Sequence, residues 1–275
     1  MLNRSQIYRS TFVMFMTFIY LVAFVFDPSV KASNTLEPER NVAIIIDDFG
    51  GVGKGTEAFL DSNIPITVAI MPFLEQSTNI ANTANDRGFE VIIHLPMEPK
   101  KGKKSWLGPK PITADLSLDE VRNRVEEAIE NVPHAKGINQ HMGSKIVENE
   151  EIITTILEVA KDHNLYFVDS GTNPNSCITS VAEKLGVPSA NRDLFLDNTL
   201  SSKGHVYEMA IKLADLADKD QTVIGIGHVG IYGLDTFQAI KKAQSYYIKN
   251  NIKIVPSSQI IKSEIDKNPE NFWLD

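Results

Sequence analysis

Acidic and imidazole side chains follow short apolar runs of this sequence at six places. The run 42–46 leads directly into Asp47 and Asp48, and the run 91–93 leads into His94. Any one such residue could be a helix cap or a hydrogen-bonded structural residue, so the prediction depends on the repetition. Carboxylates and imidazoles without cysteine suit Zn²⁺ or a similar divalent ion that keeps open positions for water. The complete set is Asp47, Asp48, His94, Asn139, His141, Asp169, Asp197 and His228.

The glycine-rich stretch that follows Asp48 does not have the pattern of a phosphate-binding loop. A P-loop places Ser or Thr directly after its Gly-Lys pair, whereas Gly55 separates Lys54 from Thr56 here. The fixed glycine register of a dinucleotide-binding fingerprint is also missing. We therefore expect these glycines to turn the chain sharply from a strand into a helix.

The elements that must position these residues alternate along the chain. Apolar runs without polar alternation are typical of parallel strands that are covered on both faces. Such strands are expected at 42–46, 66–70, 91–93, 137–139, 166–168, 194–196, 223–226 and 252–255. Helical patterns are expected at 52–62, 75–87, 117–132, 149–163, 176–185, 201–219 and 234–250. The alternation favours a closed or nearly closed α/β barrel over an open doubly wound sheet, and in such a barrel all strand ends that carry polar residues meet on one face.

The N-terminal segment has the composition of a targeting signal. Arg4 and Arg9 precede an apolar run at 11–26, and small residues near position 32 form a cleavage pattern. We expect residues 1–32 to be a cleaved signal peptide, with a retained membrane anchor as the alternative, and residues 33–41 to be a linker. Residues 42–275 are then a single catalytic domain. The protein is expected to be exported, to the periplasm or the cell surface.

The acidic charge argues against a nucleic-acid partner. The formal net charge is −8, and it becomes −10 when a segment with three basic residues and one acidic residue is removed. Such a protein is poorly suited to binding phosphate backbones. The one cysteine, Cys177, excludes an internal disulfide framework. The sequence does not indicate an oligomeric state.

Six motifs together resemble one known family. In chain order they read IIIDDFG, HLPMEP, NQHMGS, FVDSGT, FLDN and GIGHVG, between about residues 41 and 256. They are similar to the divergent polysaccharide deacetylases, a branch of the NodB-like carbohydrate esterases. The resemblance implies a distorted (β/α) barrel of about seven to eight largely parallel strands. It also implies removal of acetyl groups from N-acetylated sugars of a cell-envelope glycan, by attack of a metal-bound water.

The resemblance also implies roles for individual residues. Asp47 matches the general base, Asp48 a metal ligand, His94 the first metal-binding histidine and His228 the general acid. Asp169 and Asp197 are assigned to orienting His228 or the sugar hydroxyls, and Asn139 to the same outer group. The ion that such sites hold is a divalent metal, with Zn²⁺ favoured.

Two departures from the family pattern leave the third metal ligand open. Glu98 stands where a second histidine is usual, four residues after His94, and the usual arginine-proline motif is replaced by NQHMGS with His141. We favour His141, because two nitrogens and one carboxylate form a set that catalytic zinc accepts. Glu98 lies between prolines in a loop that can point away.

The loop 96–114 is the candidate substrate contact. It carries Trp106, whose ring could stack on a sugar, beside several lysines that would favour an anionic glycan. A solvated surface loop is the alternative. The altered motifs also keep two other functions open: a catalytically silent glycan-binding or cell-envelope module, and a metal-dependent hydrolase of another amide or an ester.

Overall fold

The computed structural model describes residues 40–198, 201–220 and 222–267. The predicted signal peptide and most of the predicted linker lie outside these residues. Arg40 and Asn41, the last two residues of that linker, belong to the first strand instead. Within the described residues, no helix combines the length and the apolar character that crossing a membrane requires.

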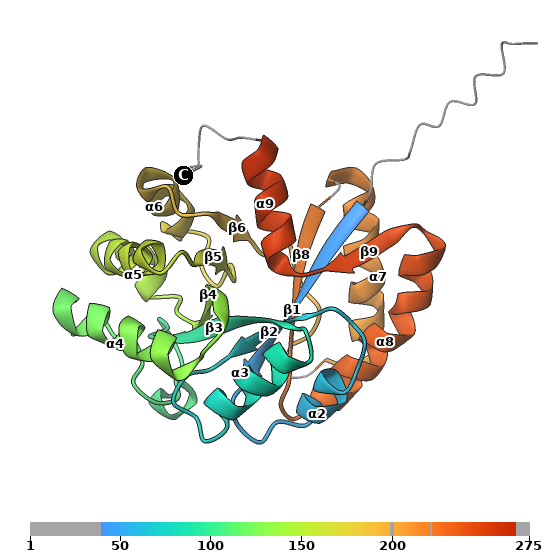
Figure 1. The fold of residues 1–275 in the computed structure, drawn as a ribbon, viewed down its shortest axis with the longest axis horizontal. Coiled ribbons are helices and arrows are strands. Elements are labelled where there is room, and N and C mark those ends of the chain that lie inside the picture. Colours follow the sequence, from blue (N-terminus) through green and yellow to red (C-terminus); the bar gives the residue numbers. More distant parts are fainter. Residues whose placement is uncertain (1–39, 199–200, 221, 268–275) are drawn as a thin grey trace, which may run out of the picture. The chain divides into compact units, whose positions relative to one another are not determined.

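Parallel strands form a curled sheet that makes an incomplete barrel (Figure 1). The strands are β1 (Arg40–Phe49), β2 (Thr67–Ile70), β3 (Glu90–Met97), β4 (Ala135–Met142), β5 (Tyr166–Asp169), β6 (Ser189–Asn191), β7 (Leu194–Phe195), β8 (Thr222–His228) and β9 (Ile252–Val255). Their order is β6-β5-β4-β3-β2-β1-β8-β7, and β9 pairs with the first half of β1. The predicted distorted barrel is confirmed, with its open seam between β6 and β7.

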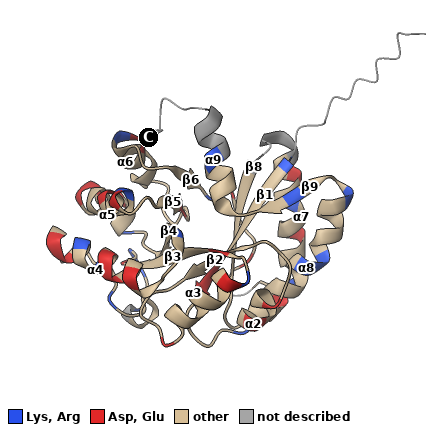
Figure 2. Ribbon diagram, viewed as in Figure 1, with Lys and Arg blue, Asp and Glu red and all other residues tan. Residues whose placement is uncertain are grey.

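Helices cover the outside of this sheet (Figure 1). They are α2 (Thr56–Leu60), α3 (Ser77–Asp86), α4 (Leu118–Asn131), α5 (Glu150–Asp162), α6 (Ile178–Leu185), α7 (Lys203–Asp220) and α8 (Gly233–Lys249). The helix α4 begins at a capping box, in which the side chains of Ser117 and Glu120 accept hydrogen bonds from each other's backbone amides. Acidic side chains gather on α4 and α5 (Figure 2), whereas the charged residues of the strands stand near the strand ends.

Two elements have no counterpart among the predicted ones. The strand β6 has the sequence Ser-Ala-Asn and becomes a strand only through its pairing with β5. The helix α9 (Ser257–Lys267) follows β9 and packs against β1 and β8. The β6 segment has no apolar run that could have predicted a strand, whereas the α9 segment does carry Ile260, Ile261 and Ile265 at helical spacing, a signal that the prediction did not use.

The helix α9 closes one end of the barrel. The inner core is small and includes Ala43, Ile45, Ile224 and Ile226, on which Ile260 and Ile261 of α9 pack. A larger core lies between the outer face of the sheet and the surrounding helices. The barrel interior is therefore filled with side chains at this end, as in other small α/β barrels.

A buried polar cluster ties the start of α9 to three strands. The hydroxyl of Tyr166 donates to Glu90 Oε1 at 2.9 Å and is 2.7 Å from Ser257 Oγ. Ser257 also bonds to Thr67, so β2, β3 and β5 all contact the first residue of α9. The ring of Tyr166 lies across Gly137, where an added Cβ would stand only 2.4 Å from a ring carbon.

We predict that Gly137→Ala lowers the free energy of unfolding by about 1–3 kcal/mol, because the Tyr166 ring is held at both ends and cannot move aside. Urea titration measures this change. The control is Gly204→Ala in α7, where the nearest atom to an added Cβ is 3.8 Å away. That substitution should leave stability unchanged or raise it by up to about 1 kcal/mol. Equal stability of the two variants would contradict the packing argument.

Candidate metal centre and active site

A bulge at the end of β1 turns two consecutive carboxylates toward the same side. Successive residues of a regular strand point to opposite faces of the sheet. The pairing of β1 with β2 slips between Ile46 and Phe49, and Asp48 has a φ of 69°. This left-handed conformation costs about 1–2 kcal/mol for most residues, though aspartate tolerates it better than most. Asp47 and Asp48 can therefore both line one pocket.

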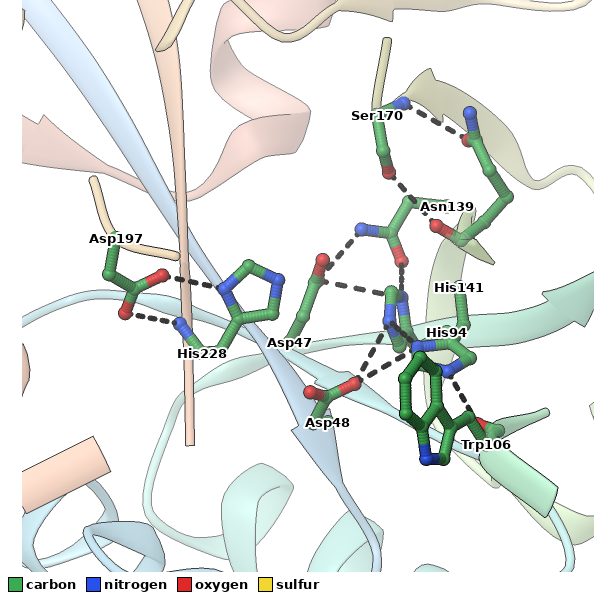
Figure 3. Close-up of polar contacts among 10 residues, drawn as sticks. Asp47, Asp48, His94, Trp106, Asn139, His141, Ser170, Asp197 and His228 are labelled. Carbon is green, nitrogen blue, oxygen red and sulfur yellow. Dashed lines mark hydrogen bonds and ion pairs between the residues drawn. The ribbon is translucent and has the colours of Figure 1, made fainter. Parts of the chain in front are cut away.

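The next two strands supply two imidazoles and an amide. Asn139 and His141 are two residues apart on β4, so they share one face. His94 on β3 is in register with Asn139. The side chains of His94 and Asn139 are buried, whereas His141 is partly exposed. All three belong to the site that Figure 3 shows.

Three donor atoms converge on one point beside these strands. Asp48 Oδ1 is 3.3 Å from His94 Nε2 and 3.1 Å from His141 Nδ1, and the two nitrogens are 3.1 Å apart. Two ligands of a tetrahedral zinc ion, each at about 2.0–2.1 Å, stand about 3.3–3.4 Å apart. Asp48 Oδ1 is also buried without a hydrogen bond of good geometry. The residues present therefore fit a divalent metal ion.

The outer nitrogens of the two histidines fix which nitrogen faces this point. His94 Nδ1 is 2.8 Å from Asn139 Oδ1, and the amide nitrogen of Asn139 donates to Asp47 Oδ1 at 2.8 Å. His141 Nε2 is 3.0 Å from the backbone oxygen of Trp106, which can only accept. The hydrogens of both rings therefore point outward, and both lone pairs point toward Asp48. Such outer partners commonly orient metal-binding histidines.

The pKa shifts of Asp48 and His94 follow from the same geometry. Burial disfavours the charged form of Asp48, but the neighbouring imidazoles outweigh it and lower the pKa of this carboxyl. Burial opposes protonation of His94, but the charges of Asp47 and Asp48 raise the pKa of its imidazole. The site thus attracts positive charge, whether a metal ion or a proton, and the two compete for the same lone pairs.

The other half of the site contains a second imidazole–carboxylate pair. His228 ends β8, in register with Asp47, and its Nδ1 is 2.6 Å from Asp197 Oδ1. The second oxygen of Asp197 accepts hydrogen bonds from the His228 amide and from Thr236. Figure 3 shows Asp47 between this pair and the three donor atoms.

The pKa values of Asp47 and His228 are both shifted in the direction that suits proton transfer. Burial raises the pKa of Asp47, although the charges of His94 and His228 oppose the rise. Burial lowers the pKa of His228, but the hydrogen bond that its imidazole donates to Asp197 and the charge of Asp47 outweigh this effect and raise the pKa to about 9. Asp47 is therefore a stronger base than an ordinary aspartate, and His228 is protonated near neutral pH.

A pocket of about 540 Å³ contains both halves. Its wall on the His228 side is apolar. Phe195 stacks on the His228 ring at 5.9 Å between centroids, and Ile231 and Tyr232 are largely exposed beside it. These apolar residues and Thr236 were not predicted as site residues, because an apolar side chain after a strand looks like any core residue in the sequence.

Three predicted site residues make contacts other than the predicted ones. Glu98 does not join the donor atoms, because its oxygens bind the Ala114 amide and the Lys145 ammonium. Asp169 Oδ1 bonds to Gln140 and to the Gly171 amide rather than to His228, so of the two predicted partners only Asp197 orients that imidazole. Trp106 contributes its carbonyl, while its side chain is 58% exposed.

A family model described as divergent polysaccharide deacetylase matches residues 44–261. The chain belongs to the divergent polysaccharide deacetylase family. It is 34% identical over 187 residues to the uncharacterized protein YibQ of Escherichia coli strain K12, and 31% identical over 192 residues to an uncharacterized protein of Haemophilus influenzae. These matches cover 68% and 69% of this chain, and 58% and 67% of the respective relatives.

Solved structures support the fold of this deacetylase-family chain. An uncharacterized protein of Agrobacterium tumefaciens C58 superposes with a TM-score of 0.74 at 18% identity, over 80% of this chain and 89% of that one. The Xyl-CE4 domain of a multidomain xylanase from the hindgut metagenome of Trinervitermes trinervoides gives 0.51 at 14% identity, over 82% and 91%. At these identities the likeness shows the fold alone.

We predict that His141→Ala weakens zinc binding on the order of 100-fold, because one of three donors is lost. Elemental analysis after dialysis and a chelator competition titration measure the change. His163→Ala is the matched control, since this surface histidine pairs with Glu126 and lies outside the site. Zinc retention by His141→Ala equal to that of the control would exclude His141 as a ligand.

A second prediction concerns the acid–base pair in the metal-free protein. Asp197→Asn should lower the pKa of His228 from about 9 toward the ordinary 6.5, as followed by NMR titration. A raised folded-state pKa stabilises the fold fully below about pH 6.5, and this contribution is lost as the pH rises through about 9. The difference in free energy of unfolding between wild type and Asp197→Asn should therefore become smaller as the pH rises from about 6.5 to about 9. An unchanged His228 titration would contradict the assigned pairing.

Proposed function

We propose that this protein is a metal-dependent hydrolase that removes acetyl groups from N-acetylated sugars of an extracytoplasmic glycan. The observation that carries the proposal is the single pocket in which the three donor atoms, Asp47 and His228 lie together. Amide hydrolysis needs an activated water, a base for its proton and an acid for the leaving amine. Family membership supports the same reaction class.

Asp48, His94 and His141 would hold the metal ion. A divalent ion bound there, for which we propose Zn²⁺, would polarise the acetyl carbonyl and lower the pKa of water. Asp47 accepts the proton of the attacking water, and Asn139 keeps this carboxylate in place through the hydrogen bond to Oδ1. Buried, it is a better proton acceptor than a solvated aspartate.

His228 acts on the opposite side of the scissile bond. Asp197 holds Nδ1, so that Nε2 is the nitrogen that can donate to the leaving amine. Phe195 stacks on the imidazole, and the guanidinium carbon of Arg192 lies over the Phe195 ring, 3.8 Å from its centroid. This packing limits rotation of the imidazole and keeps the proton aimed at the pocket.

The pocket offers the substrate both apolar and polar contacts. Tyr232 is exposed at the rim and can lie against the apolar face of a sugar ring. Ser170 and Asn198 line the same pocket and supply polar groups for substrate hydroxyls. The exposed ring of Trp106 remains a candidate contact farther out, with Lys103 over its face.

We also propose an extracytoplasmic location, because the glycan substrates of this reaction class belong to the cell envelope. The proposal is supported by family membership and by the composition of the N-terminal segment. Membrane contact is proposed only through that segment, if it is retained.

The test is acetate release from N-acetylglucosamine oligomers by the zinc-loaded protein. Asp47→Asn should lower kcat about 10²- to 10⁴-fold, the usual contribution of a positioned base, while the zinc content stays at the wild-type value. Asp61→Asn, on the surface and paired with Arg87, is the control for a lost carboxylate.

Each other outcome identifies an alternative. A zinc-loaded wild type that binds the oligomers without releasing acetate would be a silent glycan-binding module. Turnover of ester or other amide substrates, with no acetate from the sugars, would show a hydrolase of different specificity. An Asp47→Asn variant with wild-type turnover would exclude this residue as the base.

A further inference from the structure

The orientation of His141 depends on a backbone atom of a distant loop. His141 Nε2 donates to the carbonyl oxygen of Trp106, 35 positions earlier in the chain. A carbonyl only accepts hydrogen bonds, so it fixes the hydrogen on Nε2 and leaves the Nδ1 lone pair for the metal site. The position of the loop 98–114 therefore decides how well His141 can serve as a ligand.

Glu98 holds the two ends of this loop together. Its amide donates to the Ile112 carbonyl at 2.8 Å, and its Oε2 accepts from the Ala114 amide at 2.9 Å. Both bonds join the start of the loop to its end. Ile112 is fully buried, so the end of the loop is itself fixed to the core.

Glu98 also ties the loop to the segment that follows His141. Its Oε1 forms an ion pair with Lys145 Nζ at 2.7 Å, and its carbonyl accepts from the Lys145 amide at 3.2 Å. Lys145 stands four residues after His141. The hydrogen bond from Ala114 and the ion pair with Lys145 lower the pKa of Glu98, so it stays ionised under ordinary conditions.

We propose that Glu98 is a positioning residue for the metal centre rather than a ligand of it. Its carboxylate, bonded to the Ala114 amide and to Lys145, adds to the backbone bonds that close the loop 98–114 against the chain after β4. In this way it keeps the Trp106 carbonyl on His141 and raises the affinity for the ion. A partly exposed ion pair contributes little to global stability. The effect of Glu98 should thus be concentrated on metal binding. This inference rests on the proposed metal site.

The experiment compares Glu98→Ala with Glu150→Ala in the full chain. Glu150, the first residue of α5, forms an ion pair of the same length with Lys184 of α6, at 2.7 Å, so its carboxylate binds α6 rather than the loop. Zinc affinity is measured by competition with a chromogenic chelator. Loss of an outer partner typically weakens metal binding 10- to 100-fold, so Glu98→Ala should bind zinc about 10-fold more weakly and Glu150→Ala within about twofold of wild type.

A second readout follows the hydrogen bond itself. The imidazole Nε2 proton of His141 should give a protected ¹H–¹⁵N NMR signal in wild type and in Glu150→Ala, with or without zinc. Glu98→Ala should broaden or lose that signal. Urea midpoints of the two variants should be similar, which separates a local effect from general destabilisation.

Equal zinc affinities of the two variants would overturn the inference. Complete loss of zinc stoichiometry in Glu98→Ala, at saturating zinc and with the NMR signal intact, would overturn it in favour of Glu98 as a ligand. Failure of the wild type to bind zinc would instead overturn the proposed function. The NMR comparison in metal-free protein then decides separately whether Glu98 holds the loop on His141.

Discussion

Three electron-rich atoms face one another across 3.1–3.3 Å, and the rest of the site is organised around that contact. Two imidazole lone pairs and a carboxylate oxygen repel each other unless positive charge lies between them. The protein nevertheless holds them in place, with the hydrogens of both rings directed to outside acceptors. An arrangement that would be unfavourable by itself becomes stable when a cation binds, so the binding energy of the ion contributes to the stability of the folded site.

The parallel sheet explains how residues so far apart in the sequence reach this contact. Neighbouring strands in register place Asp47 beside His228 and His94 beside Asn139. The bulge in β1 then adds Asp48 to the same side. The opposite end of the barrel is filled by α9 and its polar cluster, so that the strand ends carrying the site have a rigid support.

The features that could be predicted from the sequence are those that depend on a local pattern of apolar and polar residues. Apolar runs that end in polar residues located the strands and the residues Asp47, His94 and His228. Contacts made by backbone atoms cannot be predicted from residue types. The hydrogen bond from His141 to the Trp106 carbonyl, for example, would be possible with any residue at position 106. The separation of Asp197 from Asp169 was also out of reach, because both follow a strand in the same way. Only the sheet order, with β7 beside β8 and β5 beside β4, places Asp197 next to His228.

The position of His141 explains how this chain can lack the second histidine of the usual motif. When the second imidazole comes from β4 instead of the loop after β3, the donor set keeps two nitrogens and one carboxylate oxygen. In this proposed donor set Glu98 is not needed as a ligand, and its carboxylate binds the Ala114 amide and Lys145 instead. The usual arginine is missing as well, and Asn139 bonds both to Asp47 and to His94 in that region. One amide thus connects the proposed base with a proposed ligand. A displacement of β4 would therefore disturb His141, His94 and Asp47 together.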